Sequence, residues 1–144
     1  MILSLIALLA ATVFAGMALY ITLVEQPARL ALDDGPMLAQ WQPSYRRALP
    51  IQSGLALAGG IAGLVVGYWL MDWRWLAGSV VLLANWPFTL VIIFPVNKRL
   101  MATNPREADA ASRALLVRWG NLHAVRSALG VTAVLIFASA SSGG

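Results

Sequence analysis

The sequence predicts an all-α integral membrane protein, a bundle of four transmembrane helices with antiparallel, up-and-down topology. Hydrophobic residues make up 60% of the chain and charged residues only 11%, so the chain is far more apolar and less charged than a soluble domain. The apolar residues fall into four runs, each long enough to cross a bilayer core of about 30 Å. Nearly all basic residues lie in the segments between these runs.

The four predicted spans belong to one domain, residues 1–144. They run roughly over 1–24, 48–71, 75–96 and 115–140. The first run lacks the positively charged start of a signal peptide and is long for such a peptide, so we expect a retained helix. The third contains Pro87, which lacks a backbone N–H and clashes with the carbonyl of Leu83, so we expect a kink there.

The basic residues also predict the orientation in the membrane. Of the ten lysines and arginines, only Arg74 lies in the turn between the second and third spans. The positive-inside rule therefore places loops 25–47 and 97–114 in the cytoplasm. Both termini should face outside, in the periplasm if the membrane is a bacterial inner membrane. The tryptophans beside the turn fit an interfacial aromatic belt; they are Trp69, Trp73 and Trp75.

Composition excludes several kinds of site and partner. The chain has no cysteine and one histidine, which rules out disulfides, thiolate sites and multi-histidine metal centres. The sequence pI is near 10.4, but the basic residues form no face on a soluble domain, so we expect no nucleic-acid partner. We expect no metal and no cofactor; the expected partners are membrane lipid and a lipophilic small molecule.

Small residues in the second span indicate close helix packing. Gly59, Gly63 and Gly67 stand four residues apart, with Gly60 beside them. This spacing lets helix backbones approach closely in lipid. We favour packing inside the bundle, and the alternative is the interface of a homodimer or of a larger membrane complex.

Polar residues whose burial in a membrane costs free energy lie close together at the predicted cytoplasmic ends of the helices. His123 and Arg126 share one face of the fourth span with Trp119. A helix ending at Ala140 would place Arg126 roughly 9 Å inside the core, where a charge needs a cavity or a partner. The simpler interpretations are that Arg126 snorkels to the interface and that His123 packs with a hydrogen bond.

Two further polar residues have competing interpretations. Glu25 is the acidic residue beside the membrane on that side, and we expect it to pair with Arg126, or with Arg29 or Arg46. Asn85 lies near mid-membrane beside the predicted kink. It either repairs the kink with a hydrogen bond or contacts a bound molecule.

Six stretches of the chain carry a family resemblance. They are Gly16–Tyr20, Glu25–Arg29, Tyr45–Ala48, Pro87–Thr89, Pro95–Leu100 and Arg118–Arg126. In this order and spacing they resemble a widespread membrane family of unknown function that includes the fungal anthrone oxygenases, and the last stretch is the most specific. The resemblance implies a four-helix membrane fold. It does not settle the activity, since most bacterial members have no assigned reaction.

For chemistry, the resemblance implies a cofactor-independent monooxygenase, an oxidoreductase that acts on a lipophilic aromatic or quinol. A base removes an acidic C–H proton, and the enolate reacts with O₂ to give a quinone. His123 is the candidate base, Arg126 and Asn97 would stabilise the enolate oxygen, and Glu25 would orient an imidazole or an arginine. The candidate substrate contacts are Trp119, Tyr45, Arg29, Arg46, Gln52 and Asn85.

Other functions remain open at the level of sequence. The chief alternative is a non-catalytic protein that binds lipid, quinone or haem, or a subunit of a larger membrane complex. His123 could supply one axial haem ligand, and the second would be Met17, Met37 or Met101. A transporter is the weakest alternative, because only Asn85 lies deep in the outer half of the membrane.

Overall fold

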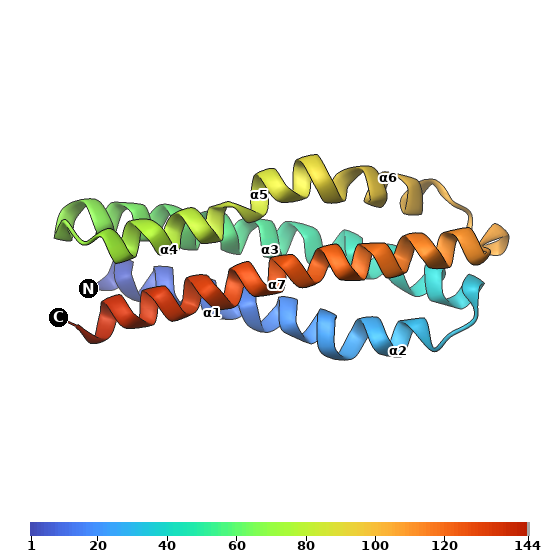
Figure 1. Ribbon diagram of the computed structural model, residues 1–144, viewed down its shortest axis with the longest axis horizontal. Coiled ribbons are helices and arrows are strands. Elements are labelled where there is room, and N and C mark those ends of the chain that lie inside the picture. Colours follow the sequence, from blue (N-terminus) through green and yellow to red (C-terminus); the bar gives the residue numbers. More distant parts are fainter. Residues whose placement is uncertain (144) are drawn as a thin grey trace.

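The computed structural model describes residues 1–143, which form four long helices and no strand. Each helix is long and apolar enough to cross a membrane; they run over Ile2–Leu30, Asp34–Leu70, Trp73–Ala102 and Ala110–Ser142. The helices lie lengthwise along one another, and both termini lie at the same end of the bundle (Figure 1). The prediction of an all-α membrane protein with four spans is confirmed.

Two of the four spans are divided into shorter elements. The first consists of α1 (Ile2–Tyr20), a π-helical segment (Ile21–Glu25) and α2 (Gln26–Leu30). The second is α3 (Asp34–Leu70). The third consists of α4 (Trp73–Leu83), α5 (Asn85–Phe88), a second π-helical segment (Thr89–Ile93) and α6 (Phe94–Ala102). A 3₁₀ turn (Pro105–Glu107) precedes the fourth span, α7 (Ala110–Ser142).

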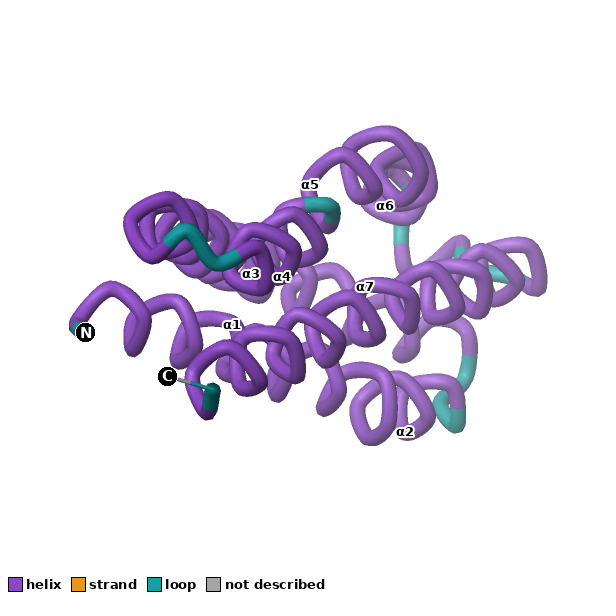
Figure 2. Tube along the Cα trace, turned by 60° about the vertical axis from the view of Figure 1, so that its left-hand side comes forward, coloured by secondary structure: helices purple, strands orange, loops and turns teal. Residues whose placement is uncertain are grey.

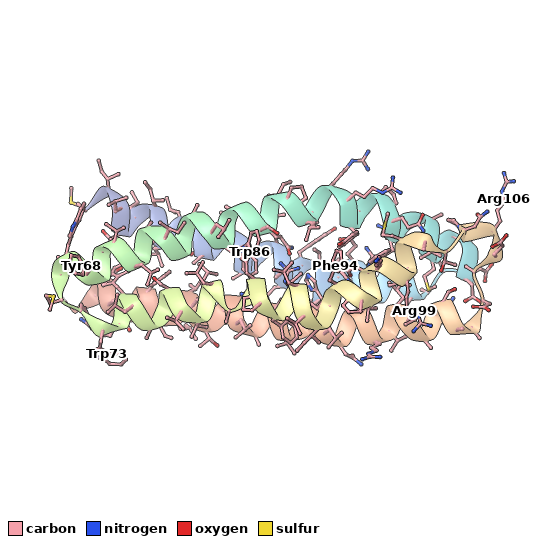
Figure 3. All side chains as sticks on the ribbon, turned by 90° about the horizontal axis from the view of Figure 1, so that it is seen from above. Tyr68, Trp73, Trp86, Phe94, Arg99 and Arg106 are labelled. Atoms are coloured by element: carbon pink, nitrogen blue, oxygen red, sulfur yellow. The ribbon has the colours of Figure 1, made fainter. Side chains whose placement is uncertain are left out.

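The helices continue well past the predicted spans at one end of the molecule. We call it the basic end; it holds the loops 31–33 and 103–109, with Arg99 and Arg106 on its surface (Figure 3). Most of the predicted loops 25–47 and 97–114 is therefore helical. α3 has 37 residues, about 55 Å of helix against a core of about 30 Å. The predicted spans are shorter than these helices because polar residues interrupt the apolar runs at this end.

Each of the two π-helical segments ends two residues before a proline. The N–H of Gln26 bonds the carbonyl of Ile21, and the N–H of Phe94 bonds the carbonyl of Thr89, five residues back in each case. Pro27 follows Gln26 in the sequence, and Pro95 follows Phe94. A proline ring clashes with the carbonyl four residues before it, so the preceding turn widens. Such single-turn π segments are frequent at functional sites.

The third span breaks where the sequence predicted a kink. α4 ends at Leu83 and α5 begins at Asn85, and α5 and α6 stand off from the line of α4 (Figures 1 and 2). Asn85 is buried, and its Nδ2 donates to the carbonyl of Leu82 at 2.9 Å. This bond agrees with the simpler of the two interpretations, but Asn85 Oδ1 is buried without a partner among the described residues, so contact with a bound molecule stays a prediction.

The half of the bundle that holds the termini is packed around small residues. A Cβ on Gly63 would lie 2.3 Å from Ser79 Oγ and 2.8 Å from Phe137, so α3 touches both α4 and α7 there. Trp75 is only 2% exposed and stacks on Phe137. The expectation that it belongs to an interfacial belt is therefore wrong, because its ring packs on Phe137 inside the bundle. Trp69 and Trp73 are exposed.

Replacing Gly63 by alanine should lower the stability of the extracted protein. The added methyl group has no free space, and overpacking typically costs about 1–3 kcal/mol. Gly54 on the same helix is the matched control, because a Cβ there meets nothing within 4 Å. Gly54→Ala should leave the midpoint of thermal unfolding unchanged or raise it, since alanine favours helix by up to about 1 kcal/mol. Equal effects of the two variants would contradict the packing assignment.

Candidate functional site

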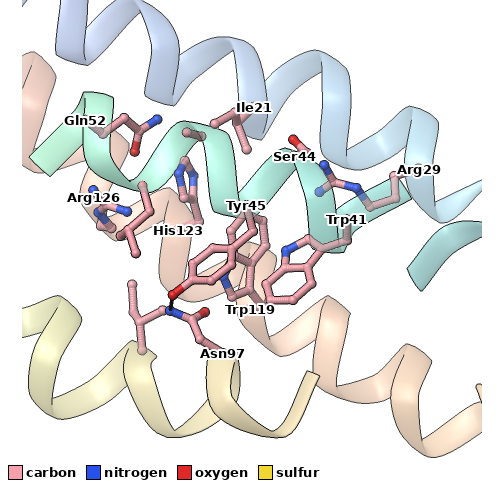
Figure 4. Close-up of a pocket in the computed structure, with 13 residues that line it drawn as sticks. Ile21, Arg29, Trp41, Ser44, Tyr45, Gln52, Asn97, Trp119, His123 and Arg126 are labelled. Carbon is pink, nitrogen blue, oxygen red and sulfur yellow. Dashed lines mark hydrogen bonds between the residues drawn. The ribbon is translucent and has the colours of Figure 1, made fainter. Parts of the chain in front are cut away.

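A small cavity lies inside the bundle, in the half nearer the basic end (Figure 4). Its volume is about 20 Å³, enough for one water molecule. All four spans contribute to its walls. The polar and aromatic side chains around it are Arg29, Trp41, Ser44, Tyr45, Gln52, Asn97, Trp119, His123 and Arg126, and the apolar ones are Ile21, Ala48, Leu49 and Ile93.

Helical periodicity on α3 and α7 brings most of these residues together. On α7, His123 and Arg126 follow Trp119 by one and two turns and so share its face. On α3, Tyr45 follows Trp41 by one turn, and Gln52 lies two turns further along the same face. The Trp41 and Tyr45 rings stack at 4.8 Å, and Trp119 meets Trp41 edge-on at 5.6 Å. The two helices therefore form one aromatic wall.

Arg126 carries a positive charge that no acidic side chain neutralises within residues 1–143. It is 6% exposed, makes no hydrogen bond or ion pair with the described residues, and its Nε is buried without a partner. The Phe14 ring lies 5.6 Å from its guanidinium carbon, a partial compensation. A buried cation in a membrane span is expensive and marks a functional site by default.

Glu25 does not pair with Arg126, which corrects the first of the three pairings considered. Its carboxylate accepts from Arg29 Nη2 at 2.9 Å, from Gln40 Nε2 at 2.9 Å and from Ser44 Oγ at 2.6 Å. Arg29 also donates to Gln26 Oε1 and to Gln40 Oε1. Arg29 is therefore neutralised by Glu25, and each of its three guanidinium nitrogens makes a hydrogen bond.

Three more buried polar atoms at the cavity lack a partner. They are Trp41 Nε1, Gln52 Nε2 and Asn97 Oδ1, and with Arg126 Nε they account for four of the six such atoms among the described residues. Buried polar groups are nearly always hydrogen-bonded. Three of the four are N–H donors, so the cavity is suited to a molecule that presents an oxygen acceptor, above all an anionic one.

His123 is held by a chain of hydroxyl groups. Its Nδ1 lies 3.2 Å from Thr22 Oγ1, which lies 2.8 Å from Ser127 Oγ. Ser127 donates to the carbonyl of His123 at 3.4 Å. Either hydroxyl can donate in the Thr22–Ser127 contact; the arrangement in which Thr22 donates to Ser127 places the ring proton on Nδ1 and leaves the lone pair on Nε2. The ring stacks on Trp119 at 4.9 Å.

Most, but not all, of the predicted site residues line the cavity. Glu25 does not line it, Arg46 is exposed and lies away from it, and Asn85 lies at the helix break. None of the candidate haem-ligand methionines lines the cavity beside His123. Sequence reasoning missed Trp41, Ser44, Thr22 and Ser127. Trp41 stands one helical turn before Tyr45 on α3. The sequence predicts a loop over 25–47, and helical spacing does not relate two residues of a loop.

Fold and site together define a four-span membrane protein with a donor-rich polar cavity enclosed by all four helices. The chain belongs to the anthrone oxygenase family, because the family model of that description matches residues 41–136. The match confirms the resemblance and includes the cavity residues of α3, α6 and α7. The comparisons found no curated protein and no solved structure that matches the chain.

Proposed function

We propose that the protein is a cofactor-independent oxygenase that converts a lipophilic phenol of the anthrone type to a quinone. The observation that carries this proposal is the unneutralised Arg126 guanidinium, one helical turn from His123 and facing a cavity with unpaired N–H donors. Such a site favours a substrate that becomes an anion during the reaction. Membership of the anthrone oxygenase family supports the same chemistry.

In the proposed reaction, Nε2 of His123 removes a proton from the methylene carbon of the substrate. The electron pair moves into the ring system and places negative charge on the oxygen across the middle ring. The carbanion carbon then bonds to O₂, and the hydroperoxide formed on protonation loses water to give a carbonyl. The balance is one methylene and one O₂ converted to one carbonyl and one water, so the substrate supplies all four electrons.

The arrangement on α7 suits the two reacting positions of an anthrone. The methylene carbon and the oxygen-bearing carbon lie on opposite sides of the middle ring, so the base and the cation must stand about one ring width apart. Side chains three residues apart on a helix face have Cβ atoms about 5–6 Å apart. His123 and Arg126 are three residues apart on α7 and both line the cavity, which supports these two roles, while Trp41 Nε1 and Gln52 Nε2 add donors for the oxygen.

Oxygen uptake by the purified protein in lipid nanodiscs tests the proposal. Anthrone should be consumed with one O₂ per molecule, and anthraquinone should appear at the same rate. The absorption spectrum of the protein should show no haem or flavin band. Uptake no faster than the spontaneous oxidation of anthrone would refute the proposal, and stoichiometric hydrogen peroxide would refute the water-forming step.

A non-catalytic binder of quinones or acidic lipids is the second candidate. The unpaired donors of Trp41, Gln52 and Arg126 support it, since quinone and carboxylate oxygens are acceptors too. Saturable binding of a quinone, with no oxygen uptake on any anthrone or quinol, would favour this candidate. Mass spectrometry of a gently extracted sample would identify the native ligand.

We also propose that the basic end faces the cytoplasm of a bacterial inner membrane. Exposed basic residues gather there, and Arg74 at the other end is paired with Asp72 at 2.8 Å. Alkaline phosphatase, which is active outside the cytoplasm, should be active when fused after Ser142 and inactive when fused after Ala102. A fluorescent protein should give the opposite pattern. Reversed patterns would contradict the orientation.

A further inference from the structure

We propose that the ligand reaches His123 and Arg126 sideways from the lipid, past Tyr45, and leaves its apolar part in a groove between α3 and the second half of the third span. The groove is lined by Tyr45, Leu49, Ser53, Trp86, Thr89, Leu90 and Phe94. We call it the Tyr45 groove. The identity of the reacting part of the ligand rests on the proposed function. The route rests on the cavities themselves.

The cavity must open before it can hold any such ligand. Its volume is about 20 Å³, whereas sites for small organic molecules measure about 300–1,000 Å³. Trp119 stacks on His123 along one wall, and the bonded Arg29 closes the side toward α2. Opening at the first place would break the stack on the candidate base, and opening at the second would break the buried Glu25–Arg29 pair.

Tyr45 lines the cavity and also both pockets beside it on this side of α3. The Tyr45 groove, of about 170 Å³, shares Tyr45 and Leu49 with the cavity. A surface pocket of about 390 Å³ shares Tyr45 and Asn97 with it. The Tyr45 side chain is held by the stack on Trp41 and by one hydrogen bond, from Asn97 Nδ2 to its hydroxyl at 3.0 Å. A rotation of this one side chain would therefore join the three spaces.

The wall opposite α3 is built from irregular helix. It contains the break before Asn85 and the π-helical segment Thr89–Ile93, and α5 and α6 stand away from the other helices (Figure 2). The hydroxyl of Thr89 is buried in this wall without a partner. An unpartnered buried hydroxyl beside a groove is a further sign that a ligand group occupies it.

The chemistry of the groove selects an apolar occupant. Its walls are carbon except for the hydroxyls of Ser53, Thr89 and Tyr45 and the indole N–H of Trp86, which donates to the carbonyl of Ser53 at 3.3 Å. At its mouth Leu90 and Phe94 are 57% and 47% exposed, on a helix apolar enough to face lipid. Trp86 and Phe94 lie well inside the length of the bundle, between the two ends (Figure 3). The substrate class is therefore a phenol with a bulky ring system or alkyl chain, drawn from the bilayer.

A competing route exists on the other side of α3. A surface pocket lined by Gly16, Met17, Tyr20, Ile21, Glu25 and Ala48 shares Ile21 and Ala48 with the cavity. Ile21 is 7% exposed and, being β-branched, is stiff at χ1, and Ala48 has no rotatable side chain, so this wall opens less readily than the one at Tyr45. We therefore assign the entrance to the Tyr45 groove, and Met17 provides a probe of the alternative.

Tryptophan substitutions that block the groove test the route by steady-state kinetics. Leu90→Trp fills the mouth of the groove, and it should raise the KM for anthrone at least tenfold. Val91→Trp is the matched control, because Val91 is the next residue, is 72% exposed and lies outside the groove; its KM should stay within twofold of wild type. Equal kinetics of the two variants would overturn the assignment of the entrance.

Cysteine protection tests the route without turnover, since the chain has no cysteine of its own. Single variants Leu90→Cys, Met17→Cys and Val80→Cys are labelled in nanodiscs, without oxygen, by a lipid-soluble maleimide; Leu90 lines the groove and not the cavity. Saturating anthrone should slow labelling at Leu90→Cys at least fivefold and leave Met17→Cys and Val80→Cys unchanged. Protection at Met17→Cys alone would overturn the route and leave the oxygenase proposal standing. Protection at Leu90→Cys by a protein that consumes no oxygen would establish the groove and refute the oxygenase.

Discussion

Replacing Arg126 by methionine is expected to stabilise the protein and to remove its oxygenase activity. The substitution keeps most of the side-chain volume and removes a buried cation that lacks an acidic partner among residues 1–143. Replacing buried charges by apolar groups of similar size often stabilises by about 1–4 kcal/mol. Loss of one electrostatic contact to a developing oxyanion costs about 10²–10³-fold in rate. Thermal unfolding and oxygen uptake on the same preparation measure both effects.

Arg29→Met is the matched control for that experiment, because Arg29 is equally buried but fully paired. Its removal leaves the Glu25 carboxylate without its cation, and breaking one partner of a buried pair destabilises by about 3–5 kcal/mol. The Glu25→Gln, Arg29→Met double variant should recover part of this loss. The interpretation of Arg126 fails if both arginine variants destabilise the protein to the same degree, since both would then be structural.

Replacing His123 by alanine should lower anthrone-dependent oxygen uptake by about 10²–10⁴-fold, the usual contribution of a positioned general base. No other histidine can take over, because His123 is the one histidine in the sequence. Added imidazole should restore part of the activity by filling the space that the side chain leaves. Wild-type rates in His123→Ala would exclude the residue as the base.

A positioning variant separates the role of the ring as a base from its role in packing. Thr22→Val removes the hydroxyl that lies within hydrogen-bond distance of Nδ1 and keeps the shape of the side chain. Uptake should fall about tenfold or more, as expected for loss of a group that orients a functional imidazole, while the His123–Trp119 stack and the unfolding midpoint change little. An unchanged rate would show that the hydroxyl chain does not set the tautomer.

The helical pattern by itself determined several features correctly. Uninterrupted apolar runs are sufficient to predict four spans, because the bilayer sets the helix length whatever the neighbours are. The break near Pro87 follows from its missing N–H, which is a local property. The common face of Trp119, His123 and Arg126 follows from the helix period alone, and the confirmed family resemblance depends on the same stretch.

The tertiary structure alone decided which groups meet. Glu25 had three possible arginine partners in the sequence; the folded chain pairs it with Arg29, one helical turn on, and adds hydrogen bonds from Gln40 and Ser44 of α3. The unpaired state of Arg126, on which the proposed function depends, emerges only when all four helices are in place. Trp41 and Thr22 join the site through contacts between helices. Local sequence sets the length, period and breaks of each helix, whereas the register between helices depends on side-chain packing across the whole bundle, and no single segment encodes it.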